Sequence, residues 1–226
     1  RSTSMPKRKK AEEIPRHIVV EGPIGVGKTT FARALAERLG ARTVLEEVEE
    51  NPFLPKFYKD RDAHAFQTQL FFLLSRFRQQ QSMLQEDLFR RNTVSDYLFQ
   101  KDRIFAHLNL GPDELALYEK IYGLLDARIP TPDLVVYLQA RAEVLLERVR
   151  IRARDWERPI TTAYLEQVSQ AYADFFFRWE KSPKLVVNTS DIDIVEREED
   201  LEDLIAAVRR MKKGVQFYNP QSRGGR

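Results

Sequence analysis

The chain has 226 residues, 42% of them hydrophobic and 31% charged, and its formal net charge is +3. This composition is typical of one soluble globular domain, because a single core can serve chains of up to roughly 250–300 residues. It excludes a membrane-spanning helix, since no apolar run of about 18 residues is present, and the absence of cysteine excludes disulfides, zinc–thiolate sites and a thiol nucleophile.

The two ends of the chain are polar and basic. The first ten residues include five basic ones without interleaved aromatic residues, which does not favour a nucleic-acid-binding arm, and no apolar stretch follows them to form a secretory signal. The four residues before Met5 resemble a remnant of cloning. The expected organisation is a flexible segment at 1–15, one folded domain at 16–212 and a flexible tail at 213–226.

The first predicted strand, residues 17–21, leads into the phosphate-loop motif G-x-x-x-x-G-K-T. Residues with helical spacing follow and stop at Gly40, so the motif has the strand–loop–helix context that it needs. The backbone N–H groups of such a loop surround a phosphate, its lysine reaches the β- and γ-phosphates, and its hydroxyl holds Mg²⁺. A glycine-rich turn with a chance Lys-Thr pair is the alternative, but the flanking elements favour a site for a nucleoside triphosphate. The residues expected to contact ATP here are Gly22, Gly25, Val26, Gly27, Lys28, Thr29 and Thr30.

Strand-length apolar runs then alternate with segments of helical periodicity. Strands are predicted at 43–46, 92–96, 133–138 and 184–188, and helices at 63–90, 114–127, 141–151, 161–180 and 199–212. This alternation predicts an α/β fold with a five-stranded parallel sheet and helices on both faces. Ligands of such sheets bind at the carboxyl ends of the strands, so the residues that follow each strand become the candidates for a site.

Acidic residues follow two of the predicted strands. After the second, Glu46 begins a run of four glutamates that ends at Glu50. A carboxylate there would face the γ-phosphate, where a hydroxyl must lose its proton, so Glu46 is a candidate general base; a solvated acidic turn is the alternative. After the third, Asp96 is placed to hold Mg²⁺ directly or through water, or to cap a helix, and both roles can hold together.

Four arginines occupy alternate positions from Arg148 to Arg154. Guanidinium groups make two-point contacts with phosphate oxygens, so these residues predict a lid, at about 150–160, that closes over a triphosphate. A solvated basic helix end paired with Glu147 and Glu157 is the alternative.

The order and spacing of these motifs resemble the deoxyribonucleoside kinase family, and most closely its bacterial deoxyguanosine and deoxyadenosine kinase branch. The resemblance covers about residues 16–210. It rests on the phosphate loop and on Glu46-Glu47-Val48-x2-Asn51-Pro52-Phe53-Leu54-x3-Tyr58, Gln69-x6-Arg76, Asp96-Tyr97, Ile104-Phe105-Ala106 and Arg148-x3-Arg152-x-Arg154-x2-Glu157. It implies a P-loop kinase fold, catalysis with Mg²⁺ and ATP, and a homodimer.

The resemblance also implies a role for each matching residue. Glu46 would take the proton of the 5′-hydroxyl, and Tyr58 and Glu157 would hold the 3′-hydroxyl of the sugar. The residues implied to contact the base or line its pocket are Ile24, Leu54, Gln69, Arg76 and Phe105. Those implied to close over the phosphates or cradle the adenine of ATP are Arg148, Arg152, Arg154, Asp191 and Ile192.

Two positions are unusual or ambiguous. Much of the family carries an arginine after the carboxylate of the third strand, whereas here Tyr97 follows Asp96; the deoxyguanosine-kinase-like branch shares this Asp-Tyr pair. Relatives also carry a base-reading aspartate, which corresponds to Lys101 or Asp102 depending on the direction of counting. A lysine could meet the acceptors of guanine and an aspartate its donors, so both alternatives remain open.

The sequence therefore predicts a cytoplasmic enzyme that transfers the γ-phosphoryl group of ATP to the 5′-hydroxyl of a deoxyribonucleoside for dNTP salvage, a purine being favoured. The alternatives are a pyrimidine or broad-range enzyme, a thymidylate-kinase-like enzyme and a non-catalytic nucleotide switch. A carboxylate such as Glu157 would repel an acceptor phosphate, and the chain lacks the Asn-Lys-x-Asp motif that reads guanine in switches. The preferred base and the choice between ATP and GTP stay open, as do feedback inhibition and oligomeric state. No nucleic-acid or membrane partner is expected.

Overall fold

The computed structural model of the chain describes residues 15–86, 92–192, 194 and 197–219. Its strands are β1 (His17–Glu21), β2 (Arg42–Val44), β3 (Thr93–Ser95), β4 (Leu134–Gln139), β5 (Lys184–Asn188) and β6 (Val215–Tyr218). Its α-helices are α1 (Lys28–Leu39), α2 (Leu54–Phe57), α3 (Arg61–Glu86), α4 (Asp102–Asn109), α5 (Pro112–Asp126), α6 (Ala142–Arg152), α7 (Thr162–Phe177) and α8 (Glu198–Arg210). Short 3₁₀ turns are η1 (Val48–Glu50), η3 (Phe99–Lys101) and η4 (Asp155–Glu157).

All strand pairs of the sheet are parallel, and the strands lie in the order β2-β3-β1-β4-β5-β6. From β1 the chain crosses to β2 at one edge of the sheet, comes back to β3 between β2 and β1, and then adds β4 on the other side of β1. The carboxyl end of β1 is therefore the point where the strand order reverses, and crevices at such points bind ligands. The phosphate-loop motif begins directly after this strand.

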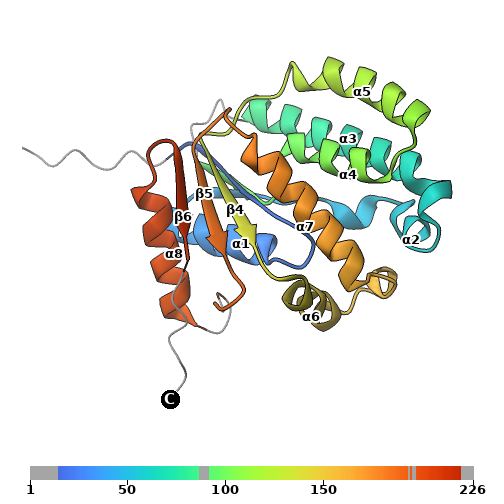
Figure 1. Ribbon diagram of the computed structural model, residues 1–226. Helices are drawn as coiled ribbons and strands as arrows, with labels where there is room; N and C mark the ends of the chain where they lie inside the picture. Colours follow the sequence, from blue (N-terminus) through green and yellow to red (C-terminus); the bar gives the residue numbers. More distant parts are fainter. Residues whose placement is uncertain (1–14, 87–91, 193, 195–196, 220–226) are drawn as a thin grey trace, which may run out of the picture.

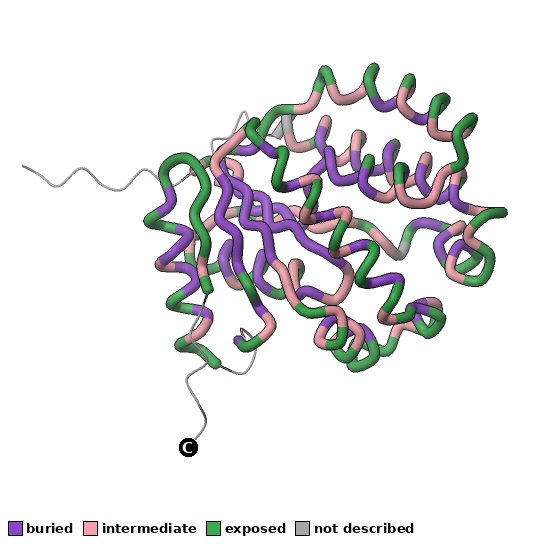
Figure 2. The backbone as a smooth tube through the Cα atoms, viewed as in Figure 1, coloured by how far each residue is buried: buried purple, intermediate pink, exposed green. Residues whose placement is uncertain are grey.

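Helices cover both faces of the sheet, as Figure 1 shows with α7 on one side and α1 on the other. The central strands are buried along nearly their whole length (Figure 2), because successive side chains such as Val19 and Val20 point to opposite faces of the sheet and both are buried. Helix α1 ends where Gly40 adopts a left-handed conformation with φ of 60° and its N–H bonds the carbonyls of Ala36 and Glu37.

A second cluster of buried side chains lies away from the sheet, between α3, α4 and α5. It contains Leu73, Phe99, Ala106, Tyr118 and Tyr122. These helices run side by side in the upper right of Figure 1, and α4 also contacts α7. The second cluster thus fixes α3 and α4 beside the carboxyl ends of the strands, where their inward side chains can contribute to a site.

The predicted α/β architecture is confirmed, and the five predicted strands and the boundaries of the predicted helices agree with the structure to within three residues. The end of the predicted helix at 63–90 lies outside the described residues. Two short helices, α2 and α4, were not predicted, because four and eight residues carry too little periodicity to be recognised. No helix in the described part of the chain has the length and apolar character needed to cross a membrane.

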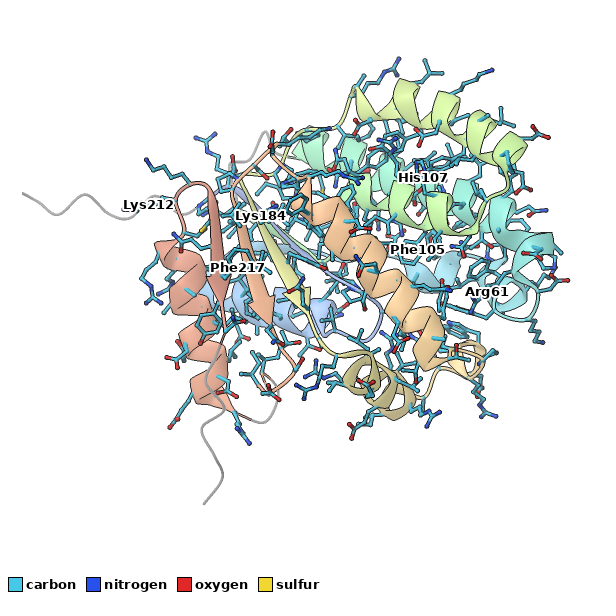
Figure 3. The ribbon with its side chains drawn as sticks, viewed as in Figure 1. Arg61, Phe105, His107, Lys184, Lys212 and Phe217 are labelled. Atoms are coloured by element: carbon cyan, nitrogen blue, oxygen red, sulfur yellow. The ribbon has the colours of Figure 1, made fainter. Side chains whose placement is uncertain are left out.

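The prediction of five strands is wrong by one, and the tail assigned to 213–226 contains the sixth. Residues Val215–Tyr218 pair with β5 in register from Lys184 opposite Val215 to Val187 opposite Tyr218. The segment was overlooked because it is short, lies beside a polar tail and leaves its side chains exposed, as with Phe217 in Figure 3. The free backbone edge of β5, a long-range feature, supplies the pairing that makes it a strand.

Candidate active site

A cavity of about 1080 Å³ opens at the carboxyl ends of the strands. Its walls come from the phosphate loop, the segment after β2, helices α3, α4 and α6, η4, and the loop after β5. The predicted site residues that line it are Ile24, Gly25, Val26, Gly27, Lys28, Thr29, Thr30, Glu46, Leu54, Tyr58, Gln69, Arg76, Asp96, Lys101, Phe105, Arg148, Arg152, Arg154, Glu157 and Ile192. The cavity lining does not include Gly22, Asp102 or Asp191, all of which the structure describes.

The phosphate loop has a conformation that requires glycine. Gly25 has φ of 84°, and a Cβ there would lie 2.6 Å from the carbonyl oxygen of Leu145. Gly27 has φ of 98° and immediately precedes α1, so the loop's N–H groups and the helix N-terminus lie at the same place. This concave backbone is suited to the phosphates of a nucleotide, because the positive end of the helix dipole attracts their negative charge.

Lys28 lies across this loop. Its ammonium donates to the carbonyl oxygens of Gly22 and Pro23, at 2.8 and 3.1 Å. Desolvation, followed by the nearby ammonium of Lys101, lowers the pKa of Lys28 from its usual value to about 8. The Lys28 ammonium thus bonds two neutral carbonyl oxygens, and the charged oxygens of a phosphate would bind it more strongly.

Thr29 and Asp96 bring together two oxygen ligands suited to Mg²⁺. The Thr29 hydroxyl donates to Asp96 Oδ2, and Asp96 Oδ1 accepts the backbone N–H of Glu46 at 2.7 Å. Mg²⁺ is commonly held by one or two protein oxygens together with substrate phosphates and water, so this pair fits the ion. The described residues contain no group of three or more His, Cys, Asp or Glu side chains that would form a metal cage of protein ligands alone.

Glu46 has a cation at each carboxylate oxygen. The guanidinium of Arg76 bonds Oε1, with Nε at 2.7 Å, and the ammonium of Lys101 is 3.0 Å from Oε2. Desolvation raises the pKa of Glu46, but Arg76 and Lys101 outweigh this effect and hold the pKa well below its usual range. Glu46 is therefore an ionised carboxylate at the inner end of the cavity, and this arrangement does not support the alternative of a solvated acidic turn.

Lys101 and Asp102 are the two alternatives for the position of the base-reading aspartate of relatives, and their side chains point to different partners. Asp102 is fully buried, accepts the hydroxyl of Tyr118 at 2.6 Å and forms an ion pair with Arg76, while its backbone oxygen accepts the amide of Gln69 at 2.9 Å. Asp102 is thus joined to Gln69 and Arg76, the two polar residues among those that the resemblance assigns to the base or its pocket. Lys101 instead faces Glu46, at the phosphate end of the cavity.

Aromatic residues form the wall between α4 and α7. Phe105, labelled in Figure 3, lies edge-on to the ring of Tyr172 with centroids 6.0 Å apart. Arg61, at the start of α3, places its guanidinium 3.7 Å from the ring centroid of Tyr164. Desolvation, followed by the nearby Tyr164 and Glu157, raises the pKa of Tyr58 far above its usual value, so its phenol remains a neutral donor.

The predicted lid arginines have protein partners in this structure. Arg152 bonds Glu157 at 2.6 Å, and Arg154 lies 3.8 Å from the same carboxylate. Arg148 donates to the carbonyl oxygens of Thr189 (2.8 Å) and Ile192 (3.3 Å) in the loop after β5, and to that of Val26 in the phosphate loop (3.4 Å). It therefore links α6 to both loops.

The two predicted residues in the loop after β5 differ in their position relative to the cavity. Ile192 lines the cavity, whereas the carboxylate of Asp191 forms an exposed ion pair with Arg141 at 3.0 Å. Asp191 thus lies outside the cavity lining, where its side chain is paired with Arg141.

Several residues at the site were not predicted. Glu21, at the end of β1, is a fully buried carboxylate directly before the phosphate loop, and Tyr172 and Phe72 contribute aromatic walls. Glu21 was overlooked because it ends an apolar strand, where a charged residue usually marks the start of a solvated turn. The two aromatic residues lie on helical stripes that indicated only a core.

A search of family models finds that the deoxynucleoside kinase model matches residues 18–213. Among curated proteins, a deoxyguanosine kinase of Bacillus subtilis is 37% identical over 86% of this chain and 96% of its own. A deoxyadenosine/deoxycytidine kinase of the same species is 32% identical over 87% of this chain and 94% of its own.

A solved structure shows the same architecture. Deoxyadenosine kinase from M. mycoides, with the products dCMP and a flexible dCDP bound, superposes with a TM-score of 0.74 at 25% sequence identity. The match covers 85% of this chain and 98% of the other. Together with the family model, this likeness extends over nearly all of the described fold.

Proposed function

The chain belongs to the deoxynucleoside kinase family, and we propose that it transfers the γ-phosphoryl group of ATP to the 5′-hydroxyl of a deoxyribonucleoside, with a purine deoxynucleoside favoured. The observation that carries this proposal is the connection between a phosphate loop and an ionised carboxylate in one cavity. Asp96 makes that connection, because it accepts both the Thr29 hydroxyl and the backbone N–H of Glu46. A base placed there meets the acceptor hydroxyl beside the phosphate to be transferred.

In the proposed reaction, the 5′-oxygen attacks the γ-phosphorus while Glu46 accepts the hydroxyl proton. The bond from the γ-phosphorus to the bridging β-phosphate oxygen breaks, and ADP leaves. The phosphate loop holds the β- and γ-phosphates with its backbone N–H groups, and Lys28 exchanges its carbonyl partners for phosphate oxygens. The Thr29 hydroxyl and the Asp96 carboxylate would hold Mg²⁺, whose charge would stabilise the transferred group. Catalysis thus rests on position and electrostatics, since phosphoryl transfer needs little covalent help from the protein.

Closure of the lid is proposed to complete the site. Arg152 and Arg154 are paired with Glu157, and a bound triphosphate would compete for their guanidinium groups. The sugar 3′-hydroxyl would in turn bond Glu157 and Tyr58, which line the same cavity. Binding of both substrates then orders the lid and excludes water, which limits hydrolysis of ATP.

The nucleobase is proposed to bind between Phe105 and the α3 face that carries Gln69 and Arg76. The contacts of these two polar residues with Asp102 support Asp102, and not Lys101, as the counterpart of the base-reading aspartate of relatives. Gln69, Arg76 and Asp102 then form the base-reading group. A purine preference is supported by the names of the relatives, among which deoxyguanosine and deoxyadenosine kinases recur.

The proposed assembly is a homodimer and the proposed location is the cytoplasm, where ATP is available. Leu117 and Leu124 support a subunit contact, because they are exposed, lie seven residues apart and so share the outward face of α5.

The test is an initial-rate assay with ATP and Mg²⁺ against deoxyguanosine, deoxyadenosine, deoxycytidine, thymidine and guanosine. A preference for a purine deoxynucleoside supports the proposal in full. A preference for deoxycytidine keeps the kinase activity but overturns the purine assignment. Turnover of none of these, with turnover of a nucleoside monophosphate instead, overturns the proposed acceptor.

A further inference from the structure

Lys101 is a buried cation that lies between two carboxylates. The residue is 2% exposed, and its ammonium nitrogen is 3.0 Å from Glu46 Oε2 and 3.6 Å from Glu21 Oε2. It ends η3, the turn that leads into α4, and it lines the cavity. Enclosing an ammonium in this way is costly unless good partners surround it, so its position is specified by the two glutamates.

Glu21 serves as the fixed partner of this pair. It is fully buried, and its Oε1 accepts the backbone N–H of Gly22 at 2.9 Å and the hydroxyl of Tyr172 at 3.1 Å. Its Oε2 accepts the backbone N–H of Leu98 at 2.7 Å. These bonds come from the phosphate loop, α7 and the chain after β3, so the carboxylate cannot turn without breaking contacts to several elements.

Glu46, by contrast, is held through the cations Arg76 and Lys101 and through the bond of its backbone N–H to Asp96. Its side chain lies on the segment after β2, where Arg76 holds Oε1 and Lys101 holds Oε2. Arg76 has a second partner in Asp102, within the group that faces the base. Lys101 has its second partner in Glu21, at the end of the cavity occupied by the phosphate loop.

We propose that Lys101, anchored by Glu21, is a positioning residue for phosphoryl transfer, and that it aims the Glu46 carboxylate at the 5′-hydroxyl beside the phosphate loop. This inference rests on the proposed function and adds a residue that is distinct from the base-reading group. The ammonium fixes one carboxylate oxygen, and the remaining lone pairs of Glu46 are left to accept the proton. A positive charge at this place also favours the approach of the triphosphate to the acceptor.

The experiment compares kcat and both KM values for Lys101→Met, Lys101→Gln and Lys101→Arg with those of the wild type. Lys101→Met should lower kcat by about 100-fold, the usual cost of misplacing a reacting group by ~1 Å. The KM values for ATP and the nucleoside should change by less than about threefold, because the phosphate loop and the residues proposed to contact the base keep their side chains. Lys101→Gln retains a hydrogen-bond donor without the charge, and its kcat should resemble that of Lys101→Met. Lys101→Arg retains the charge, and its kcat should be at least about tenfold higher than that of Lys101→Met.

Lys184→Met is the matched control. Lys184 is also a buried lysine, but it begins β5 at the opposite end of the sheet (Figure 3), where its ammonium donates to the carbonyl oxygens of Phe176 and Trp179. Its replacement should leave kcat unchanged. Thermal unfolding and ATP binding of every variant show whether the fold is retained.

The outcomes separate this inference from the proposed function. An inactive wild type overturns the function and the inference together. An active wild type with equally active Lys101→Met or Lys101→Gln overturns the inference alone. A change confined to the nucleoside KM, with a different size for each base, would make Lys101 a base-reading residue and would likewise overturn it.

Discussion

At the scale of single residues, the most consequential feature is the Glu46 carboxylate, whose negative charge is balanced by neighbouring cations. Glu46 has one cation at each oxygen, and their effect on its pKa exceeds the opposing effect of desolvation. The Glu46 side chain therefore stays ionised at every pH used in an ordinary enzyme assay. Its competence as a base depends on the incoming hydroxyl, whose proton becomes more acidic as the 5′-oxygen bonds to phosphorus.

Glu46→Gln tests this role. The amide keeps the size of the side chain but cannot accept the proton, so kcat should fall by at least about 100-fold. ATP affinity should change little, since Lys28 and the loop backbone hold the phosphates. Rate measurements and isothermal titration with ATP check the two parts.

Glu47→Gln is the control for that experiment, because Glu47 is the neighbouring exposed glutamate of the same segment. It should retain wild-type rates. A Glu46→Gln enzyme with substantial activity would remove the general base from the proposed mechanism.

At the scale of elements, Arg148 joins three segments that are far apart in sequence. From α6 it reaches the phosphate loop at Val26 and the loop after β5 at Thr189 and Ile192. These carbonyl acceptors are part of the backbone that surrounds the proposed ATP site. The orientation of α6 and the shape of the nucleotide site are thus coupled through one guanidinium group.

Arg148→Lys should therefore weaken ATP binding. An ammonium cannot reproduce the several N–H donors of the guanidinium, and the loss of about two hydrogen bonds, each worth roughly 1 kcal/mol, should raise the KM for ATP by about 10- to 30-fold. The nucleoside KM should remain near its wild-type value. Arg150→Lys, on the exposed face of the same helix, is the control. Equal effects in both variants would argue against the link.

The edge strand β6 shields β5, the last strand that the sequence predicted. A chain ending after Gly214 loses β6 and leaves the outer backbone edge of β5 unpaired, so it should unfold at a lower temperature and aggregate more readily. A chain ending after Tyr218 keeps β6 and should behave like the full chain. Thermal unfolding with light scattering compares the two, and equal stability would show that β6 contributes nothing.

At the scale of the whole molecule, the outer face of α5 is the surface that best fits the proposed dimer. This helix is the outermost layer beyond α3 in Figure 1, and Leu124 on it is 73% exposed. Burial of such side chains against a second copy would stabilise an interface by roughly 1.5–3 kcal/mol each.

Leu124→Glu should accordingly produce a monomer. Light scattering coupled to gel filtration should give the wild type twice the 26.5 kDa of the chain and the variant a single chain. Phe177→Glu, which removes an apolar side chain that is 87% exposed on α7, should leave the dimer intact. A variant Leu124→Glu that remains dimeric would place the interface elsewhere.

Much of the fold and of the candidate site follows from local patterns. The phosphate loop is recognisable because glycines at fixed positions are required by backbone geometry, as Gly25 shows. The buried strands are recognisable because a sheet covered on both faces needs continuous apolar runs. Residues whose spacing matched the family, such as Tyr58 and Glu157, do line one cavity although 99 positions separate their numbers.

By itself, the sequence determined the α/β class and the phosphate loop, because each depends on neighbours within one strand, turn or helix. Most other predicted residues of the cavity wall came from the resemblance to the family. Only the tertiary structure decided that Lys101 faces Glu46 while Asp102 joins Arg76, that Glu21 anchors a buried cation, and that Val215–Tyr218 completes the sheet. These features depend on contacts between segments that are distant along the chain. Adjacent residues such as Lys101 and Asp102 have the same local pattern, and only packing against other elements determines which partner each one meets.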